Sequence, residues 1–488
     1  MTYQFENLRR RILPISLTAT ELLAAMENGQ LSAAELAHSL VEQASRCQNI
    51  NALVNFDADR FLSAAEESDK KRAAGELLGP LHGLPLVAKD NIDVAGFPTT
   101  ASTPALANNR PSRTSPVMQK LINAGAIVMA KANMHELAFS PGIAPPEDGG
   151  EIIYGAHGST RNPYDLERSP AGSSTGTAAA IGAHIAPAGL GTDTGGSVRN
   201  PAAWCGISGL RPTIKRYDQK GVVPISWTRD TIGPMARSVA DLALLDQVIS
   251  GEDENENVEL SSLRLGIYED FFCTDADPEI LTVYEREVAR LEDAGVDIVN
   301  VEIPELEETI ADAGQGISLY EVVRSLPKYL DDVGAEVSIE DVFDQVAASG
   351  LGSFLNSLLA ERAFPEEDYL KSVETYRPAL QKMYSDSFID YKLDALIFPA
   401  TLVQPFNLQT WGMHRHKGKE ISQFAASSHN VQPASIGGSP GLTVAAGLSN
   451  SGLPVALGFD GPNGGDRKLL AIGQAYEAIR PPIPGPNQ

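Results

Sequence analysis

Residues 169–201 read S-P-A-G-S-S-T-G-T-A-A-A-I-G-A-H-I-A-P-A-G-L-G-T-D-T-G-G-S-V-R-N-P, and this stretch decides how we interpret the chain. Glycine stands beside serine twice, in G-S-S at 172–174 and in G-G-S at 195–197, and a small-residue apolar run joins the two clusters. Glycine lets the main chain approach a ligand closely and lets successive N–H groups converge on one point. A hydroxyl nucleophile and its oxyanion hole both need that arrangement, so the stretch predicts a catalytic cradle. A flexible or tightly packed loop is the alternative that composition leaves open.

The composition is that of a large folded protein with a strongly acidic character. Of the 488 residues, 43% are hydrophobic and 21% are charged, and the formal net charge is −25. These hydrophobic and charged fractions are ordinary for globular proteins. The negative charge argues against nucleic acid or an anionic membrane as a partner, because binding phosphate groups requires a basic patch. The length is sufficient for two or more domains, although large α/β enzymes also form a single unit.

The cysteines and histidines predict neither a disulfide framework nor a metal site. Cys47, Cys205 and Cys273 are far apart and form no C-x-x-C pair. No H-E-x-x-H motif occurs, and the pair His414-x-His416 lacks an obvious third ligand. The glycine-rich stretches also lack the spacing of a nucleotide-binding motif, so we expect no cofactor. A Ser-His-Asp triad stays open at this point.

The first residues and the hydropathy of the chain predict a cytoplasmic protein. Residues 1–11, M-T-Y-Q-F-E-N-L-R-R-R, are polar and charged and have no apolar core region. No apolar run approaches the roughly 20 residues that a membrane-spanning helix needs. We therefore expect a location in the cytoplasm, in reducing surroundings, and no membrane partner.

Predicted strands and helices alternate along the chain. Capping boxes, in which a serine or threonine is followed three residues later by glutamate, begin two N-terminal helices at Thr18-x-x-Glu21 and Ser32-x-x-Glu35. Short apolar runs of the kind that form buried strands occur at 84–88, 126–130, 296–301 and 393–398. Capping residues followed by proline begin further helices at Ser115-Pro116 and Asp277-Pro278. This alternation predicts an α/β architecture with a largely parallel or mixed central sheet covered by helices.

Lys89 ends the first of these predicted strands, and two interpretations of it stay open. A lysine at the end of a buried strand usually extends to solvent or pairs with a carboxylate, and Asp90 and Asp93 are available. The alternative is a desolvated, uncharged lysine that acts as a base, because burial lowers the pKa of an amine.

Residues 251–430 differ in composition from the rest of the chain. An acidic segment opens this region, and helical, acidic stretches follow that carry the isolated aromatic residues Tyr320, Tyr329, Phe354 and Trp411. We expect the region to shape substrate access. Aromatic residues in such a setting more often belong to the core than to a pocket.

Several motifs in a fixed order resemble the amidase signature family. Lys89 stands in V-A-K-D-N-I-D-V, Ser173 in A-G-S-S-T-G-T, and Ser197 in G-T-D-T-G-G-S-V-R-N-P. The resemblance continues through K-A-N-M-H-E-L-A-F and D-T-I-G-P-M-A-R-S-V-A-D to the C-terminus and is weakest between 260 and 420. It implies one α/β/α domain over 1–488. Its parts are an N-terminal helical layer (18–80), a catalytic core (81–250), the variable substrate-access region (251–430) and a C-terminal return to the core (431–488).

The resemblance implies hydrolysis of carboxylic amides by a Ser-cisSer-Lys triad. Ser197 is then the nucleophile, Ser173 the bridging serine after a cis peptide bond, and Lys89 the base that accepts the proton. The two serines are 24 residues apart, as in the family. The family's oxyanion hole corresponds to the backbone N–H groups of Thr194, Gly195, Gly196 and Ser197. We further expect Asp193 and Arg199 to pair and hold this loop, and Ser174 to support the bridge through a hydrogen bond.

One departure from the family pattern concerns the main chain around the bridging serine. Ala171, Thr175 and Thr177 stand where the common G-G-S-S-G-G-S pattern has glycine, glycine and serine. Threonine adopts a positive φ less readily than glycine, so we expect right-handed or extended backbone at Thr175.

The substrate implied by the resemblance is a small aryl-substituted amide. Residues 224–234, P-I-S-W-T-R-D-T-I-G-P, and the stretch from 458 are most similar to the mandelamide and indoleacetamide hydrolase group. A primary amide or anilide would then be cleaved to an acid and ammonia or an amine through an acyl-enzyme. Two alternatives stay open: the glutaminase subunit of a tRNA-dependent amidotransferase, which needs partner chains, and a catalytically silent binding protein. The small amide is the only partner we expect, and a homodimer stays open.

Overall fold

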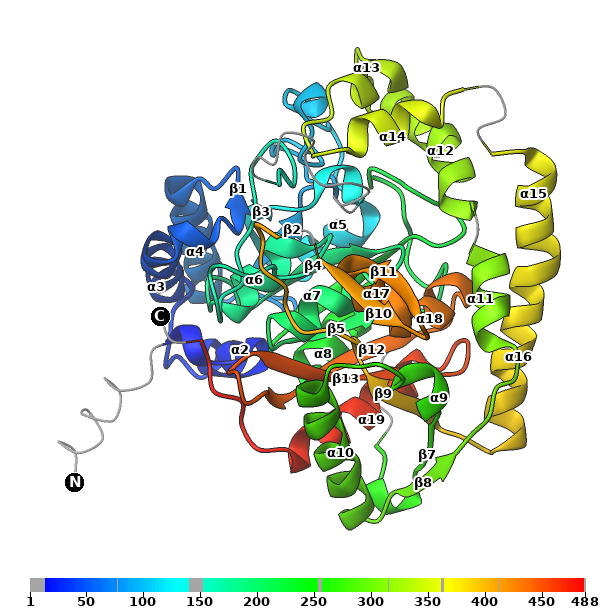
Figure 1. Cartoon of the computed structure of the whole chain (residues 1–488). Coiled ribbons are helices and arrows are strands. Elements are labelled where there is room, and N and C mark those ends of the chain that lie inside the picture. The colour runs from blue at the N-terminus through cyan, green and yellow to red at the C-terminus, as the bar shows by residue number, and fades with distance from the viewer. Residues whose placement is uncertain are drawn as a thin grey trace.

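The strands of the computed structural model form one large sheet and one hairpin (Figure 1). The structure describes residues 14–486 except 77, 140–151, 253–256, 315, 361–363 and 411. Residues 1–11, from which a cytoplasmic location was predicted, and Trp411, one of the aromatic residues of the region 251–430, lie outside this described part. The strands are β1 (Leu53–Val54), β2 (Pro85–Lys89), β3 (Ile127–Ala132), β4 (Ala188–Asp193), β5 (Ser208–Arg211), β6 (Thr231–Ala236), β7 (Arg264–Ile267), β8 (Asp297–Asn300), β9 (Ala395–Pro399), β10 (Met413–His416), β11 (Lys419–Ser422), β12 (Gly441–Leu448) and β13 (Pro454–Asp460).

The large sheet is mixed, and its strand order within the described residues is β1-β3-β2-β4-β6-β5-β12-β13-β9-β7-β8. Strand β2 is parallel to both β3 and β4, and β7 is parallel to both β8 and β9. The central strands from β4 to β9 pair in antiparallel fashion. Strands β10 and β11 form a separate two-stranded hairpin. The predicted α/β architecture with a mixed sheet is therefore confirmed.

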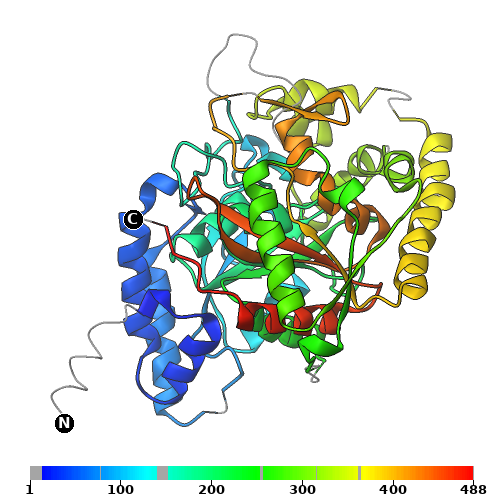
Figure 2. The same ribbon diagram turned by 60° about the horizontal axis from the view of Figure 1, so that its bottom comes forward.

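Helices cover both faces of the sheet (Figures 1 and 2). The α-helices are α2 (Ala19–Glu27), α3 (Ala33–Arg46), α4 (Ala58–Ala73), α5 (Pro116–Asn123), α6 (Thr175–Gly182), α7 (Arg199–Trp204), α8 (Val239–Ser250), α9 (Glu269–Phe272), α10 (Pro278–Asp293), α11 (Leu306–Gly314), α12 (Ile317–Val333), α13 (Ile339–Asp344), α14 (Leu351–Ser357), α15 (Glu366–Lys371), α16 (Arg377–Asp390), α17 (Gln423–Ser428), α18 (Gln432–Gly437) and α19 (Asp466–Ile479). A π-helical segment, η6 (Ser372–Tyr376), joins α15 to α16. The short 3₁₀ segments are η1 (Pro14–Ser16), η2 (Gln48–Ile50), η3 (Pro104–Leu106), η4 (Glu136–Ala138), η5 (Leu260–Ser262) and η7 (His429–Val431).

The element boundaries follow the local signals in the sequence. Both predicted capping boxes are present, at the start of α2 and of α3. Proline stands at the start of α5 and α10, each after a side-chain cap. Strands β2, β3, β8 and β9 lie at nearly the predicted positions. Thr175 begins helix α6, so its backbone is right-handed as expected, whereas Ala171 adopts a φ of 58°.

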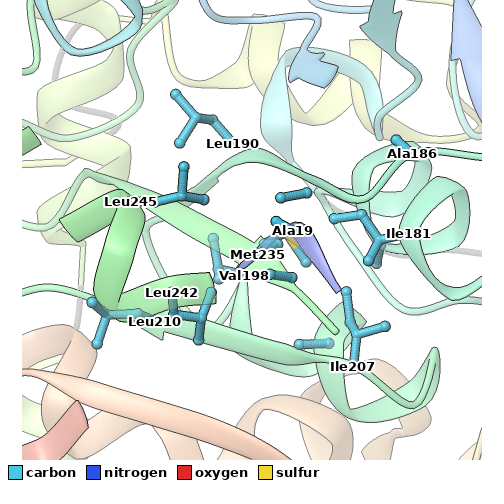
Figure 3. Packing of buried hydrophobic residues seen from close by; sticks show 14 of the residues in the cluster. Ala19, Ile181, Ala186, Leu190, Val198, Ile207, Leu210, Met235, Leu242 and Leu245 are labelled. Atoms are coloured by element: carbon cyan, nitrogen blue, oxygen red, sulfur yellow. The ribbon is translucent and has the colours of Figure 1, made fainter. Parts of the chain in front are cut away.

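The main core lies between the sheet and the helices that cover it. Every residue of β2, β4, β6 and β9 is buried, as expected for strands with both faces covered. Figure 3 shows Leu210 of the sheet beside Leu242 of α8, and Met235 beside Val198. Helix α10 crosses the sheet over β12 and β13 (Figure 2). This packing fixes the ends of the strands that carry the site.

Helices α11–α16 of the region 251–430 lie at the top and along the right of Figure 1, whereas α10 of the same region packs on β12 and β13. Tyr329 is buried in an apolar cluster with residues of α13 and α14, and Phe354 packs against that cluster. The Tyr320 ring stacks on Tyr369 with ring centroids 3.9 Å apart. Tyr320, Tyr329 and Phe354 therefore contribute to packing, which is the more common role for such residues.

Candidate active site

Lys89 lies in the interior, at the carboxyl end of β2 and beside the end of β4. Strands β2 and β4 are parallel neighbours, with Ala88 opposite Leu190, so their carboxyl ends meet at one edge of the sheet. Lys89 is 0% exposed, and its Nζ lies 2.9 Å from Ser173 Oγ. The structure thus brings together two of the three predicted triad residues, although 84 positions separate them in the sequence.

Thr192, on β4, orients the amine of Lys89. Lys89 Nζ lies 2.7 Å from Thr192 Oγ1, which also accepts a hydrogen bond of 3.1 Å from Asn91 Nδ2. A hydroxyl oxygen has two acceptor lone pairs. In the structure, Lys89 Nζ donates to one of these lone pairs and the Asn91 amide donates to the other. When the amine is neutral, its lone pair is then free to face Ser173.

Burial determines the protonation of Lys89. Loss of hydration lowers the pKa of Lys89 to about 7, and the attraction of Asp193 and Asp230 offsets only part of that effect. A charged amine is strongly disfavoured in a dry interior, whereas a neutral amine is not. At neutral pH a large fraction of the protein therefore carries an uncharged lysine at this position.

One interpretation of the sequence allowed an ion pair between Lys89 and Asp90, but Asp90 pairs with a different lysine. Asp90 Oδ1 instead lies 3.4 Å from Lys131 Nζ, with both side chains fully buried. Asp93 accepts a 2.9 Å hydrogen bond from the Tyr329 hydroxyl. The carboxylates that follow Lys89 in the sequence are thus engaged elsewhere, which corrects the expectation of a local ion pair.

Ser173 and Ser197 lie on neighbouring segments. The Gly172–Ser173 peptide bond is cis, and the Ser174 N–H donates to Ser197 O at 3.2 Å. Ser173 is fully buried, whereas Ser197 is partly exposed. Within the described part of the chain, the Ser197 hydroxyl makes no hydrogen bond. Hydrogen bonds between catalytic groups are often long without a substrate and tighten when one binds.

The loop of residues 194–198, called here the Gly195–Gly196 loop, offers N–H groups to a ligand. Among described residues, the N–H groups of Thr194, Gly195 and Ser197 donate to no acceptor. The Gly196 N–H donates to Asp193 Oδ1 at 2.9 Å. Of the four donors that the resemblance implies, the Gly196 N–H therefore already has an acceptor in this structure.

Asp193 is the centre of a buried ion-pair network beneath this loop. Arg199 Nε donates to Asp193 Oδ2 at 3.1 Å, and Arg211 NH1 donates to Oδ1 at 3.0 Å. The three side chains are 1% exposed or less. Despite its burial, the two guanidinium groups hold the pKa of Asp193 below its usual range. The expected pairing of Asp193 with Arg199 is present, while Arg211 was not singled out in the sequence.

Ser174 is also buried, and it holds β4 rather than Ser173. Its hydroxyl donates to Thr192 O and accepts from the Thr192 N–H, each at 3.3 Å. A Cβ on Gly191 would lie 2.6 Å from Ser174 Oγ, so only glycine fits there. Ser174 therefore fixes the strand residue that orients Lys89, which is an indirect form of the expected support.

The outer side of the Gly195–Gly196 loop is held by residues 226–230. Arg229 Nε donates to Thr194 O at 3.1 Å, and the Thr194 hydroxyl donates to Asp230 Oδ1 at 2.6 Å. Gln432 accepts from Arg229 and donates to Gly195 O at 3.1 Å. Sequence reasoning missed these partners because they come from two segments, 229–230 and 432, that are distant from the loop in the sequence.

Glu321 of α12 ties the variable region to the site. Its carboxylate accepts from the Thr228 N–H at 3.0 Å and from the Tyr369 hydroxyl at 2.8 Å. It also accepts from the hydroxyls of Ser226 and Thr228. Trp227, between them, is 46% exposed and lines a cavity of about 420 Å³ together with Asp230 and Ser325.

Comparison with known proteins identifies the family. Residues 35–470 match the amidase family model, and the chain belongs to that family. It is 37% identical to an indoleacetamide hydrolase of Agrobacterium vitis over 467 residues, 96% of this chain and 97% of that protein. It is 36% identical to a mandelamide hydrolase of Pseudomonas putida over 482 residues, 96% and 92% of the two chains. The peptide amidase of Stenotrophomonas maltophilia superposes with a TM-score of 0.83 at 29% identity, covering 97% of this chain and 98% of that one.

The family membership predicted from the motifs is thus confirmed, and with it amide hydrolysis as the activity. Among described residues, no group of three or more histidine, cysteine, aspartate or glutamate side chains is arranged to hold a metal ion. No helix in the described ranges has the length and apolar character needed to cross a membrane.

Proposed function

We propose that this amidase hydrolyses a small aryl-substituted amide through an acyl-enzyme on Ser197. The observation that carries the mechanism is the 2.9 Å contact with Ser173 of a fully buried Lys89, whose pKa burial lowers to about 7. A serine hydroxyl is a poor nucleophile until a base accepts its proton. Lys89 is the available base, and the Ser173 hydroxyl links it to the neighbouring segment that carries Ser197.

The proposed reaction has two matching halves. Ser197 Oγ attacks the amide carbonyl carbon, its proton passes to Ser173, and the proton of Ser173 passes to Lys89. The N–H groups of Thr194, Gly195 and Ser197 stabilise the oxyanion, and one such donor typically contributes about 2.7 to 4 kcal/mol. The C–N bond then breaks as the proton returns by the same route to the leaving nitrogen. Water then attacks the ester of the acyl-enzyme with the help of the same proton relay, and the acid is released.

The aryl preference rests on Trp227 and on the relatives. Residues on both sides of Trp227 are bonded to Glu321 or to the Gly195–Gly196 loop, while its indole stays half exposed beside a cavity. An exposed aromatic surface on a fixed loop favours an apolar, flat substrate group. Two relatives of similar length are named for indoleacetamide and mandelamide, and both of these amides carry an aromatic ring.

A substrate panel tests both parts of the proposal. Ammonia release is measured with indoleacetamide, mandelamide, a short aliphatic amide, glutamine and a peptide amide. We expect the aryl amides to give the highest kcat/KM, while preference for glutamine would favour the glutaminase alternative. Lys89→Ala should nearly abolish hydrolysis in a folded protein, and near-normal kcat in that variant would exclude Lys89 as the base. Labelling by a fluorophosphonate that is lost in Ser197→Ala would exclude a silent binding protein.

A further inference from the structure

His135 lies directly behind the Ser173 relay, in a position that the proposed chemistry does not use. Its N–H donates to Ser173 O at 3.2 Å, and its side chain is 3% exposed. A Cβ built on Gly172 would lie 2.1 Å from His135 Cε1 and 2.3 Å from Nδ1. The imidazole ring is therefore in tight contact with the main chain that carries Ser173, and only glycine fits at 172.

Among the described residues, the ring makes packing contacts and no side-chain hydrogen bond. His135 Nδ1 is buried and has no hydrogen-bond partner among the described residues. The ring packs on Tyr154, with centroids 5.2 Å apart. Because no described residue bonds to this nitrogen, the contact of the ring with its surroundings depends on its bulk.

The charge state of the ring agrees with its position. Burial, and secondly the charge of Lys89, lower the pKa of His135 to about 3. The ring is therefore neutral near neutral pH. It contributes bulk without charge next to the lysine. The charged groups that act on Lys89 are Asp193 and Asp230, and both favour its protonated form.

We propose that His135 is a positioning residue that seals the back of the Lys89–Ser173 contact against water and so keeps the lysine amine uncharged near neutral pH. The inference rests on the proposed role of Lys89 as the base. Without the ring, a space would open between the Tyr154 ring and the peptide groups of Gly172 and Ser173, and a cavity with polar groups in its wall can hold water. Water there would hydrate the ammonium form of Lys89 and oppose the desolvation that lowers its pKa.

The test compares His135→Ala, which opens the space, with His135→Leu, which fills it with a side chain of similar size. The measurement is kcat/KM against pH from 5.5 to 10 with one aryl amide, because this profile reports the free enzyme. We expect the acid limb of His135→Ala to move at least one pH unit to the alkaline side. Activity at pH 7 would then fall about fivefold or more and recover above pH 9. The acid limb of His135→Leu should stay near that of the wild type.

The outcomes separate the inference from the proposed function. If the wild-type limb is absent or persists in Lys89→Ala, the assignment of the base fails whatever His135 does. If the limb depends on Lys89 but stays in place in His135→Ala, the sealing role is overturned. Equal shifts in the Ala and Leu variants would also overturn it, because a ring nitrogen would then be what matters. Thermal unfolding checks folding, and His135→Asn replaces the alanine variant if that variant does not fold.

Discussion

Thr192→Val is the substitution that most directly tests how the lysine amine is oriented. Valine keeps the branched shape of threonine at this 5% exposed position and removes only the hydroxyl. That hydroxyl lies 2.7 Å from Lys89 Nζ and 3.1 Å from Asn91 Nδ2. The change therefore removes the acceptor of two hydrogen bonds and leaves Ser173 and the Gly195–Gly196 loop in place.

The size of the effect follows from those two donors. A buried donor left without a partner costs about 1 to 3 kcal/mol, so the free energy of unfolding should fall by an amount of that order. The amine of Lys89 would also be free to rotate and turn an N–H toward Ser173. A loss of about 2 kcal/mol in the productive orientation lowers kcat about 30-fold. Because the lysine remains, a residual, pH-dependent activity should persist.

The assay is ammonia release from an aryl amide, with kcat and KM measured separately and unfolding followed by heat. We expect kcat to fall while KM changes little, because Thr192 is buried against the lysine amine and does not line the cavity beside Trp227. Thr192→Ser is the matched control, since it retains the hydroxyl and loses only a methyl group. A kcat of Thr192→Val within threefold of the wild type would refute the reasoning. Equal damage in both variants would assign the effect to packing.

Three further predictions concern pH and the loop around Trp227. The kcat/KM of the wild type should rise as pH increases through about 7, because Lys89 is the base only when deprotonated; a profile flat from pH 6 to 8 contradicts this. Burial raises the pKa of Asp460 to about 7, so its contribution to stability is greatest at low pH and is lost as pH rises through 7. The melting temperature of Asp460→Asn should therefore depend less on pH between 5 and 8 than that of the wild type. Glu321→Gln places an NH₂ group among the donors of residues 226–228 and should raise KM for aryl amides several-fold more than for aliphatic ones; equal changes would show a general loss of folding.

The parts of the fold that were predictable are those with local signals. The capping boxes before α2 and α3 contain both of their partners within four residues, so the helix starts follow from sequence alone. Strand β2 is an apolar run from Pro85 to Ala88 that ends in Lys89, and the apolar run by itself predicted a buried strand. The order of the motifs around Lys89, Ser173 and Ser197 indicated the family without any knowledge of contacts.

The partner of Asp90 could not be predicted in the same way. Successive side chains of a strand point to opposite faces, so Asp90 cannot share the direction of Lys89 at the end of β2. Lys131 lies on the neighbouring strand β3, whose register pairs it with Ala88. That register depends on the packing of the whole sheet. The position of Asp90 next to Lys89 in the sequence therefore did not predict that Asp90 pairs with Lys131.

The buried charges near the site explain why the negative charge of Asp193 does not keep Lys89 in its protonated form. An isolated carboxylate so close to an amine would hold a proton on the lysine and leave no base. Here, the guanidinium groups of Arg199 and Arg211 both donate to the carboxylate oxygens of Asp193 and balance its negative charge. The negative charge is largely compensated before it acts on Lys89, so desolvation remains the larger effect and the pKa of the lysine falls to about 7. The same carboxylate accepts from the N–H groups of Gly196 and Val198. One ion-pair network therefore both shapes the Gly195–Gly196 loop and allows the lysine to lose its charge.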